Sequence, residues 1–90
     1  MDTRSVLAKV PGVSRNDLYY WESLGMIKPS KITAGKARRN EYSEADFRLI
    51  QMIHYHRLAA HLADFPLREI YRRAKDDIEK GLTLKNMLAR

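Results

Sequence analysis

The sequence predicts a mainly α-helical fold with one small β-hairpin and a second pair of helices. Apolar residues recur at helical spacing in four segments, Ser-x-x-Asp pairs precede two of these segments, and glycine or proline separates them. A side-chain oxygen before a helix satisfies its free amides, and glycine or proline ends it. The 90 residues suffice for one domain with a modest core.

Charge and composition narrow the functional classes. The chain has 17 Lys and Arg against 11 Asp and Glu, a net charge of +6, which favours a polyanionic partner. It has no cysteine, which removes disulfides and thiolate metal sites. No apolar run approaches the roughly 18 residues of a membrane span, and the N-terminus lacks the apolar part of a signal peptide. We therefore expect a cytoplasmic protein that does not enter a membrane.

The first predicted helix covers about residues 4–10. Thr3 is its candidate N-cap, and Pro11 with Gly12 ends it. Its apolar residues fall on one side of a helix: Val6, Leu7 and Val10.

The second predicted helix covers about residues 15–24. Ser14 and Asp17 form a weak capping box, and Gly25 followed by Pro29 ends the helix. Three adjacent rings, Tyr19-Tyr20-Trp21, cannot all face one core. We expect Leu18 and Trp21 to face the core and both tyrosines to face outward. Two short helices joined by a turn containing glycine have the spacing of a helix-turn-helix, although any small bundle has similar hairpins.

A basic hairpin is predicted next, over about residues 28–42. Five basic residues and no acid lie between Lys28 and Arg39, around a turn at Gly35. Strand-like pairs, Met26-Ile27 and Glu41-Tyr42, flank this run. Because it directly follows the second helix, the hairpin could lie as a wing against DNA phosphates. The alternative is a solvated loop with no binding role.

The third predicted helix starts after Ser43, which has Asp46 at the capping-box position, and runs for about twenty residues. Its apolar positions are Phe47, Ile50, Ile53, Leu58 and Leu62. Three histidines also fall here: His54, His56 and His61. No two of them have the i, i+4 spacing of a helical ligand pair, so we expect neither a metal nor a cofactor.

The fourth predicted helix has Pro66 in its first turn and ends with Lys80 and Gly81. Its apolar positions are Leu67, Ile70, Ala74 and Ile78, and its other face, with Arg68, Arg72, Arg73 and Lys75, is expected to be solvated. Thr83 is the candidate N-cap of a further helix with Leu84, Met87 and Leu88 on its apolar side, of which only two turns are present.

Read together, these segments resemble the DNA-binding domain of the MerR family of transcriptional regulators, over about residues 3–74. Four stretches in the family's order carry the resemblance. They are Leu7-Ala8-Lys9 with Gly12-Val13-Ser14, then Leu18-Tyr19-Tyr20-Trp21-Glu22 with Gly25-Met26-Ile27 and Pro29, then Tyr42-Ser43-Glu44-Ala45-Asp46, and finally Phe65-Pro66-Leu67-Arg68-Glu69-Ile70.

The resemblance implies a winged helix-turn-helix with a second helix pair, which binds double-stranded DNA as a homodimer at a near-palindromic promoter element. The helix at about 15–24 would enter the major groove and the basic wing at 28–42 would lie on the phosphate backbone. The residues implied to contact DNA are Ser14, Arg15, Asn16, Tyr19, Tyr20, Lys31, Lys36, Arg38 and Arg39. Residues 1–81 would form the DNA-binding domain and 82–90 the start of a C-terminal, dimerising helix, without the family's effector domain.

The chain departs from the family at four positions. Tyr19 stands where the family usually has Arg, and Asp17 where it has Thr. Arg4 stands where a buried aliphatic residue is preferred, and Asn40 where Arg is common. The DNA sequence recognised should therefore not be borrowed from other members.

Two alternatives remain open beside a transcriptional regulator. A small winged domain also suits an architectural or recombination-directing factor, and the Tyr-Tyr-Trp row suits a helical protein-interaction module. An enzyme is not expected, because the chain has no phosphate-cradling glycine loop, no nucleophile signature and no paired carboxylates.

Overall fold

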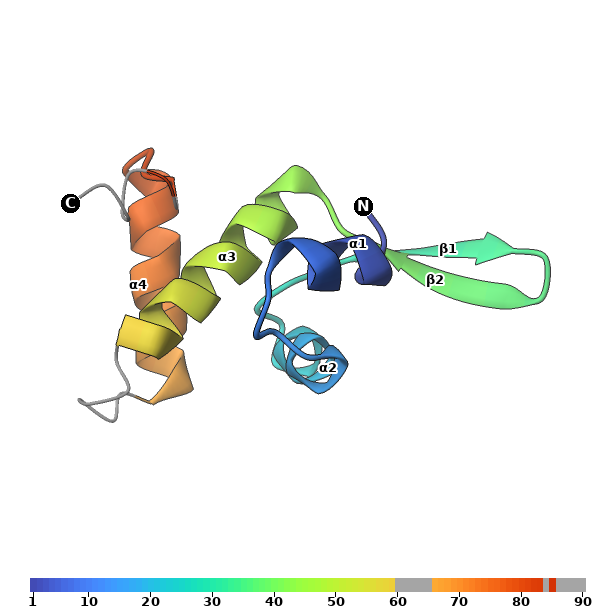
Figure 1. The fold of residues 1–90 in the computed structure, drawn as a ribbon, viewed down its shortest axis with the longest axis horizontal. Helices are drawn as coiled ribbons and strands as arrows, with labels where there is room; N and C mark the ends of the chain where they lie inside the picture. The colour runs from blue at the N-terminus through green and yellow to red at the C-terminus, as the bar shows by residue number, and fades with distance from the viewer. Residues whose placement is uncertain (60–65, 84, 86–90) are drawn as a thin grey trace. The chain divides into compact units, whose positions relative to one another are not determined.

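The computed structural model describes residues 1–59, 66–83 and 85, and within them the protein is mainly α-helical with one β-hairpin (Figure 1). The chain forms two compact units, Met1–Phe47 and Arg48–Arg90. The elements, in chain order, are α1 (Thr3–Lys9), α2 (Arg15–Ser23), β1 (Ser30–Ala34), β2 (Ala37–Glu41), α3 (Glu44–Ala59) and α4 (Leu67–Glu79). The predicted fold class, a winged helix-turn-helix with a second helix pair, is confirmed.

Helix α1 is capped by Asp2, so the prediction of Thr3 as its N-cap is wrong. Oδ1 of Asp2 accepts a hydrogen bond from the Ser5 amide at 2.8 Å, and the Asp2 backbone is extended (φ −86°, ψ 175°), as an N-cap requires. Because this carboxylate takes the capping position one residue earlier, Thr3 becomes the first helical residue. The predicted apolar side is confirmed, with Val6 and Val10 buried and Leu7 partly buried.

Both ends of α2 carry the predicted signals. The Asp17 amide donates to Ser14 Oγ at 3.1 Å, and the Ser14 amide donates to Asp17 Oδ2 at 3.0 Å, which completes the capping box. At the other end Gly25 has a φ of 77°, a left-handed conformation that closes a helix. After the turn between α1 and α2, the α2 side chains Leu18 and Trp21 are buried in the core of the first unit.

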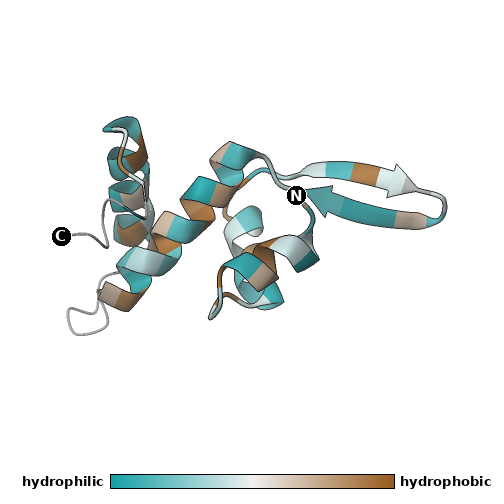
Figure 2. Ribbon diagram, turned by 45° about the horizontal axis from the view of Figure 1, so that its top comes forward, coloured by the Kyte–Doolittle hydropathy of each residue, from teal (hydrophilic) through white to brown (hydrophobic). Residues whose placement is uncertain are grey.

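Strands β1 and β2 form the predicted wing as a two-stranded antiparallel hairpin. Gly35 (φ 63°) and Lys36 make its turn, because Ala34 pairs with Ala37. In Figure 1 the hairpin extends away from α1 and α2, and in Figure 2 strand β2 is largely in hydrophilic colours. The wing is therefore a polar projection of the first unit.

Met26 and Ile27 are not strand residues, which corrects the predicted start of the hairpin. Both side chains are buried in the core of the first unit. Pro29 has no amide hydrogen for a β ladder, and the Lys28 amide donates to Asp46 Oδ1 at 3.2 Å instead. At the other end, Tyr42 is also buried rather than in a strand.

Helix α3 begins with the predicted capping box. The Asp46 amide donates to Ser43 Oγ at 3.0 Å, and the Ser43 amide donates to Asp46 Oδ2 at 3.4 Å. Ile50 and Ile53 are fully buried, as predicted. Leu58 is 60% exposed, so its predicted core position is wrong; with 3.6 residues per turn, residue 57 rather than 58 lies one turn beyond Ile53.

Helix α4 packs on α3 within the second unit, where His56 Nε2 and Asp77 Oδ2 are 2.5 Å apart. Ile70 and Ala74 are buried, as predicted. Pro66 is the N-cap rather than a first-turn residue, because its ψ of 152° is extended. The predictions for His61, Leu62, Leu84, Met87 and Leu88 lie outside the described residues.

Candidate nucleic-acid interface

The first turn of α2 presents polar side chains to solvent. Ser14, Arg15 and Asn16 are all exposed. The Ser14 oxygen accepts the capping hydrogen bond from the Asp17 amide, which leaves its own O–H able to donate to a ligand. The Asp17 carboxylate returns a bond to the Ser14 amide, so its charge is engaged in closing the helix end. Asp17 therefore has a structural role as part of the capping box.

Four neighbouring side chains of α2 are buried or exposed as the sequence predicts. Leu18 and Trp21 are 0% and 2% exposed, whereas Tyr19 and Tyr20 are 51% and 56% exposed. The two hydroxyls lie on the outer side of the helix, where each has one O–H to donate.

The wing carries its basic side chains on the surface: Lys36, Arg38 and Arg39 are exposed. Because side chains alternate along a strand, Arg38 and Arg39 lie on opposite faces of β2. Arg38 lies opposite Thr33, and Arg39 lies opposite the exposed Ile32. The hairpin thus presents a guanidinium on each face.

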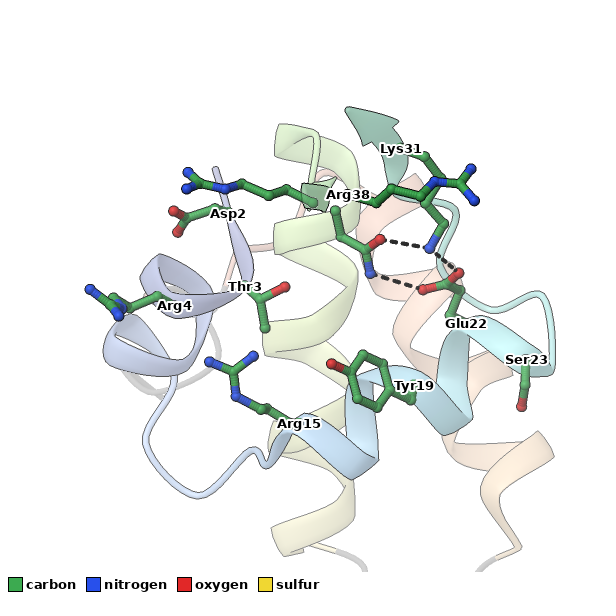
Figure 3. A pocket seen from close by; sticks show the side chains of 11 residues that line it. Asp2, Thr3, Arg4, Arg15, Tyr19, Glu22, Ser23, Lys31 and Arg38 are labelled. Atoms are coloured by element: carbon green, nitrogen blue, oxygen red, sulfur yellow. Dashed lines mark hydrogen bonds and ion pairs between the residues drawn. The ribbon is translucent and has the colours of Figure 1, made fainter. Parts of the chain in front are cut away.

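A cleft of the first unit connects α1, the outer face of α2 and the base of the wing (Figure 3). Five of its side chains are cationic and two are carboxylates. The residues that line it are Asp2, Thr3, Arg4, Arg15, Tyr19, Glu22, Ser23, Lys31, Arg38, Arg39 and Asn40.

Both carboxylates in the cleft are engaged by the protein itself. Asp2 caps α1 through the Ser5 amide, and this hydrogen bond, with Arg39 and Arg4 nearby, holds the pKa of Asp2 below its ordinary value. Glu22 accepts hydrogen bonds from Lys31 Nζ at 2.6 Å and from Asn40 Nδ2 at 3.1 Å. Within the described ranges, the structure records no ion pair for the guanidinium groups of Arg4, Arg15, Arg38 and Arg39.

The cleft unites some of the predicted DNA contacts and adds others. It brings together Arg15, Tyr19, Lys31, Arg38 and Arg39, whereas Ser14, Asn16, Tyr20 and Lys36 lie outside its lining. Sequence reasoning missed the lining residues Asp2, Thr3, Arg4, Glu22, Ser23 and Asn40. Arg4 could have been predicted as a surface residue, because the resemblance implies a buried aliphatic residue at its position and Arg is charged.

A family model for the MerR HTH family regulatory protein matches residues 3–75. The chain belongs to the MerR helix-turn-helix family. Proteins of this family are DNA-binding regulators of transcription rather than enzymes. Neither the search of curated proteins nor that of solved structures gave a significant match to the chain.

In this MerR-family chain, each of the two histidines that the structure describes contacts a charged side chain. His56 binds Asp77, and His54 Nδ1 is 2.9 Å from Nη2 of Arg57. Within residues 1–59, 66–83 and 85, no group of three potential ligand side chains is arranged to hold a metal ion. Of the helices in these same ranges, none is long and apolar enough to cross a membrane.

Proposed function

We propose that this MerR-family chain recognises a specific sequence in double-stranded DNA and regulates transcription from a near-palindromic promoter element. Helix α2 would lie in the major groove, and the wing would lie on the phosphate backbone. No catalytic step is involved.

The cleft in the first unit is the observation that supports this proposal most directly. Four guanidinium groups without ion pairs in the described ranges surround it, while both carboxylates are engaged within the protein. Positive charge that the protein does not neutralise is available to phosphates, and each neutralised phosphate releases counterions. A surface whose charges are already paired within the protein would gain far less binding free energy from contacts with phosphates.

The proposed contacts are of two kinds, those to base edges and those to phosphates. Ser14, Arg15 and Asn16, in the exposed first turn of α2, would donate to base edges or nearby phosphates, because the start of a recognition helix reads the groove. Tyr19 and Tyr20 would donate their hydroxyls to phosphates. Lys36, Arg38 and Arg39 would supply charge from the wing.

The proposal includes a homodimer, because a near-palindromic site mirrors a two-fold protein. Residues 1–81 would act as the DNA-binding domain and residues 82–90 as the start of a dimerising helix.

Selection of bound duplexes from a random pool tests the function. We expect enrichment of a near-palindromic consensus, since two copies related by two-fold symmetry read the same half-site twice. Failure to enrich any sequence would contradict specific recognition. An enriched site that leaves a neighbouring reporter promoter unchanged would instead favour an architectural or recombination-directing factor.

A helical protein-interaction module is the second candidate, favoured by the exposed Tyr19, Tyr20 and Leu24 on α2. Such a module would not respond to DNA. Addition of a random duplex at low salt would then leave the tyrosine and tryptophan spectra unchanged, whereas DNA binding at this face would alter them.

A further inference from the structure

Three polar side chains join the wing to α2 at the base of the hairpin, and we name them the wing-base cluster: Glu22, Lys31 and Asn40. Lys31 Nζ on β1 donates to Glu22 Oε2 on α2 and to Asn40 Oδ1 on β2, both at 2.6 Å. Asn40 Nδ2 donates to Glu22 Oε1 at 3.1 Å. These bonds close a ring across three elements (Figure 3).

Beside this cluster, the N-terminus holds the base of the wing, where Asp2 forms an antiparallel bridge with Glu41 and the Met1 amine pairs with the Glu41 carboxylate. A two-stranded hairpin is marginally stable by itself in water, and the described side chains from Ser30 to Arg39 are all exposed. The base of the hairpin contacts the core, where Asn40 Nδ2 also lies 3.3 Å from the hydroxyl of the buried Tyr42. The wing-base cluster therefore supplies contacts that apolar packing does not supply.

Each member of the cluster uses its polar groups on the other members. Both carboxylate oxygens of Glu22 have a donor, and both ends of the Asn40 amide are engaged. Lys31 is paired to Glu22, so its charge is locally balanced. Two of the three N–H groups of Lys31 are donated within the cluster, so a phosphate would meet a charge already balanced by Glu22. Arg38 and Arg39 differ, because the described residues record no ion pair for them.

We propose that Lys31 and Asn40 are positioning residues, which with Glu22 fix the orientation of the wing relative to α2 before DNA arrives. Their effect on binding, which rests on the proposed function, would come from preorganisation of the cations Arg38 and Arg39 beside α2. Lys31 would then not act as a phosphate contact.

The salt dependence of DNA affinity separates these two roles for Lys31. A phosphate contact contributes about 0.9 to the slope of log K against log salt, whereas a positioning residue contributes affinity without that increment. The double variant Glu22→Gln/Lys31→Met keeps the net charge and removes the pair. We expect it to bind DNA about twofold to fivefold more weakly with an unchanged slope.

Arg39→Met is the matched control, since it removes one unpaired charge from the other strand of the same hairpin. For each bound chain, we expect this variant to flatten the slope by about 0.9. Lys31→Met alone should weaken binding without flattening the slope. If Lys31→Met flattens it as much as Arg39→Met, Lys31 contacts phosphate and the positioning role is wrong.

A second measurement needs no DNA. Amide exchange and ¹⁵N relaxation of residues 31–40 in the free protein report the order of the wing. We expect Glu22→Gln and Asn40→Ala to raise wing mobility, and Lys31→Arg, which keeps charge and donors, to preserve order. Trp21 fluorescence during thermal unfolding checks that the core remains intact.

The two measurements test separate claims, so either claim can be contradicted without the other. A wing that is equally ordered in Glu22→Gln, Asn40→Ala and the natural chain would overturn the proposal even if DNA binds well. An absence of any DNA binding would overturn the proposed function while the wing measurement still decides the role of the cluster.

Discussion

Arg4 lies on α1, outside the helix and the hairpin to which the sequence assigns DNA contacts. Its side chain is exposed and lines the same cleft as Arg15 and Arg39. From α1, Val6 and Val10 are the residues buried in the core. The charge of Arg4 therefore extends the basic surface onto a third element.

If α1 also contacts the DNA backbone, Arg4→Ala should weaken binding to all sequences alike. For each bound chain, the slope of log K against log salt should flatten by about 0.9, the increment for one phosphate. Lys9→Ala is the control, because Lys9 is exposed on the same helix but does not line the cleft. Equal slopes for the two variants would exclude a contact from Arg4.

Arg15 and Asn16 should affect specificity rather than general affinity. Both are exposed in the first turn of α2, and neither caps the helix. We expect Arg15→Ala and Asn16→Ala each to cost about 1–3 kcal/mol at one base pair of the site and to relax preference there. Affinities for a panel of single-base variants measure this. A uniform loss across the panel would assign these residues to the backbone instead.

At the scale of elements, local signals predicted the helices well and the long-range contacts poorly. The capping pairs Ser14–Asp17 and Ser43–Asp46 were readable because both partners lie three residues apart. Gly35 marked the hairpin turn for the same reason. By contrast, Glu22 meets Asn40 across 18 positions, and no spacing rule connects them. The start of β1 was missed because the strand propensity of Met26 and Ile27 gave way to burial in the core.

The wing as an element should contribute charge from both of its faces. Arg38→Ala/Arg39→Ala is expected to weaken binding to all sequences. For each bound chain it should flatten the salt slope by about 1.8, or about 0.9 for each of two phosphates. The control is Arg72→Ala/Lys80→Ala, which removes two charges of the second unit that are already paired with Glu69 and Asp76. An unchanged slope for the wing variant would remove the wing from the interface.

The cap of α1 should respond to acid. The Ser5 amide lowers the pKa of Asp2 from its ordinary 3.8, so the charged form is favoured in the folded state. The stabilisation is therefore full above about pH 3.8 and is lost as the pH falls through the lower folded pKa. The Ser5 amide shift followed by NMR should report this loss. Asp2→Asn, which caps without titrating, should show no such transition.

At the scale of the whole molecule, net charge does not mark the interface. The first unit has eight basic and six acidic residues, and the second has nine and five. Acids of both units are engaged within the protein, but in the first unit the guanidinium groups around the cleft have no ion pair within the described ranges. The engaged acids of the first unit are Asp2, Asp17 and Asp46 in helix caps, Glu22 in the wing-base cluster, and Glu41 with the Met1 amine.

The proposed homodimer makes a prediction about the whole assembly on DNA. If two copies bind a near-palindromic site, a full-site duplex should take up two chains, and its salt slope should be about twice that of a half-site duplex. For about ten phosphates in all, the full-site slope would be near −9. Sedimentation of the complexes gives the stoichiometry, and affinities across a salt series give the slopes. One chain per full site, with equal slopes on both duplexes, would contradict the dimer but leave DNA binding by α2 and the wing intact.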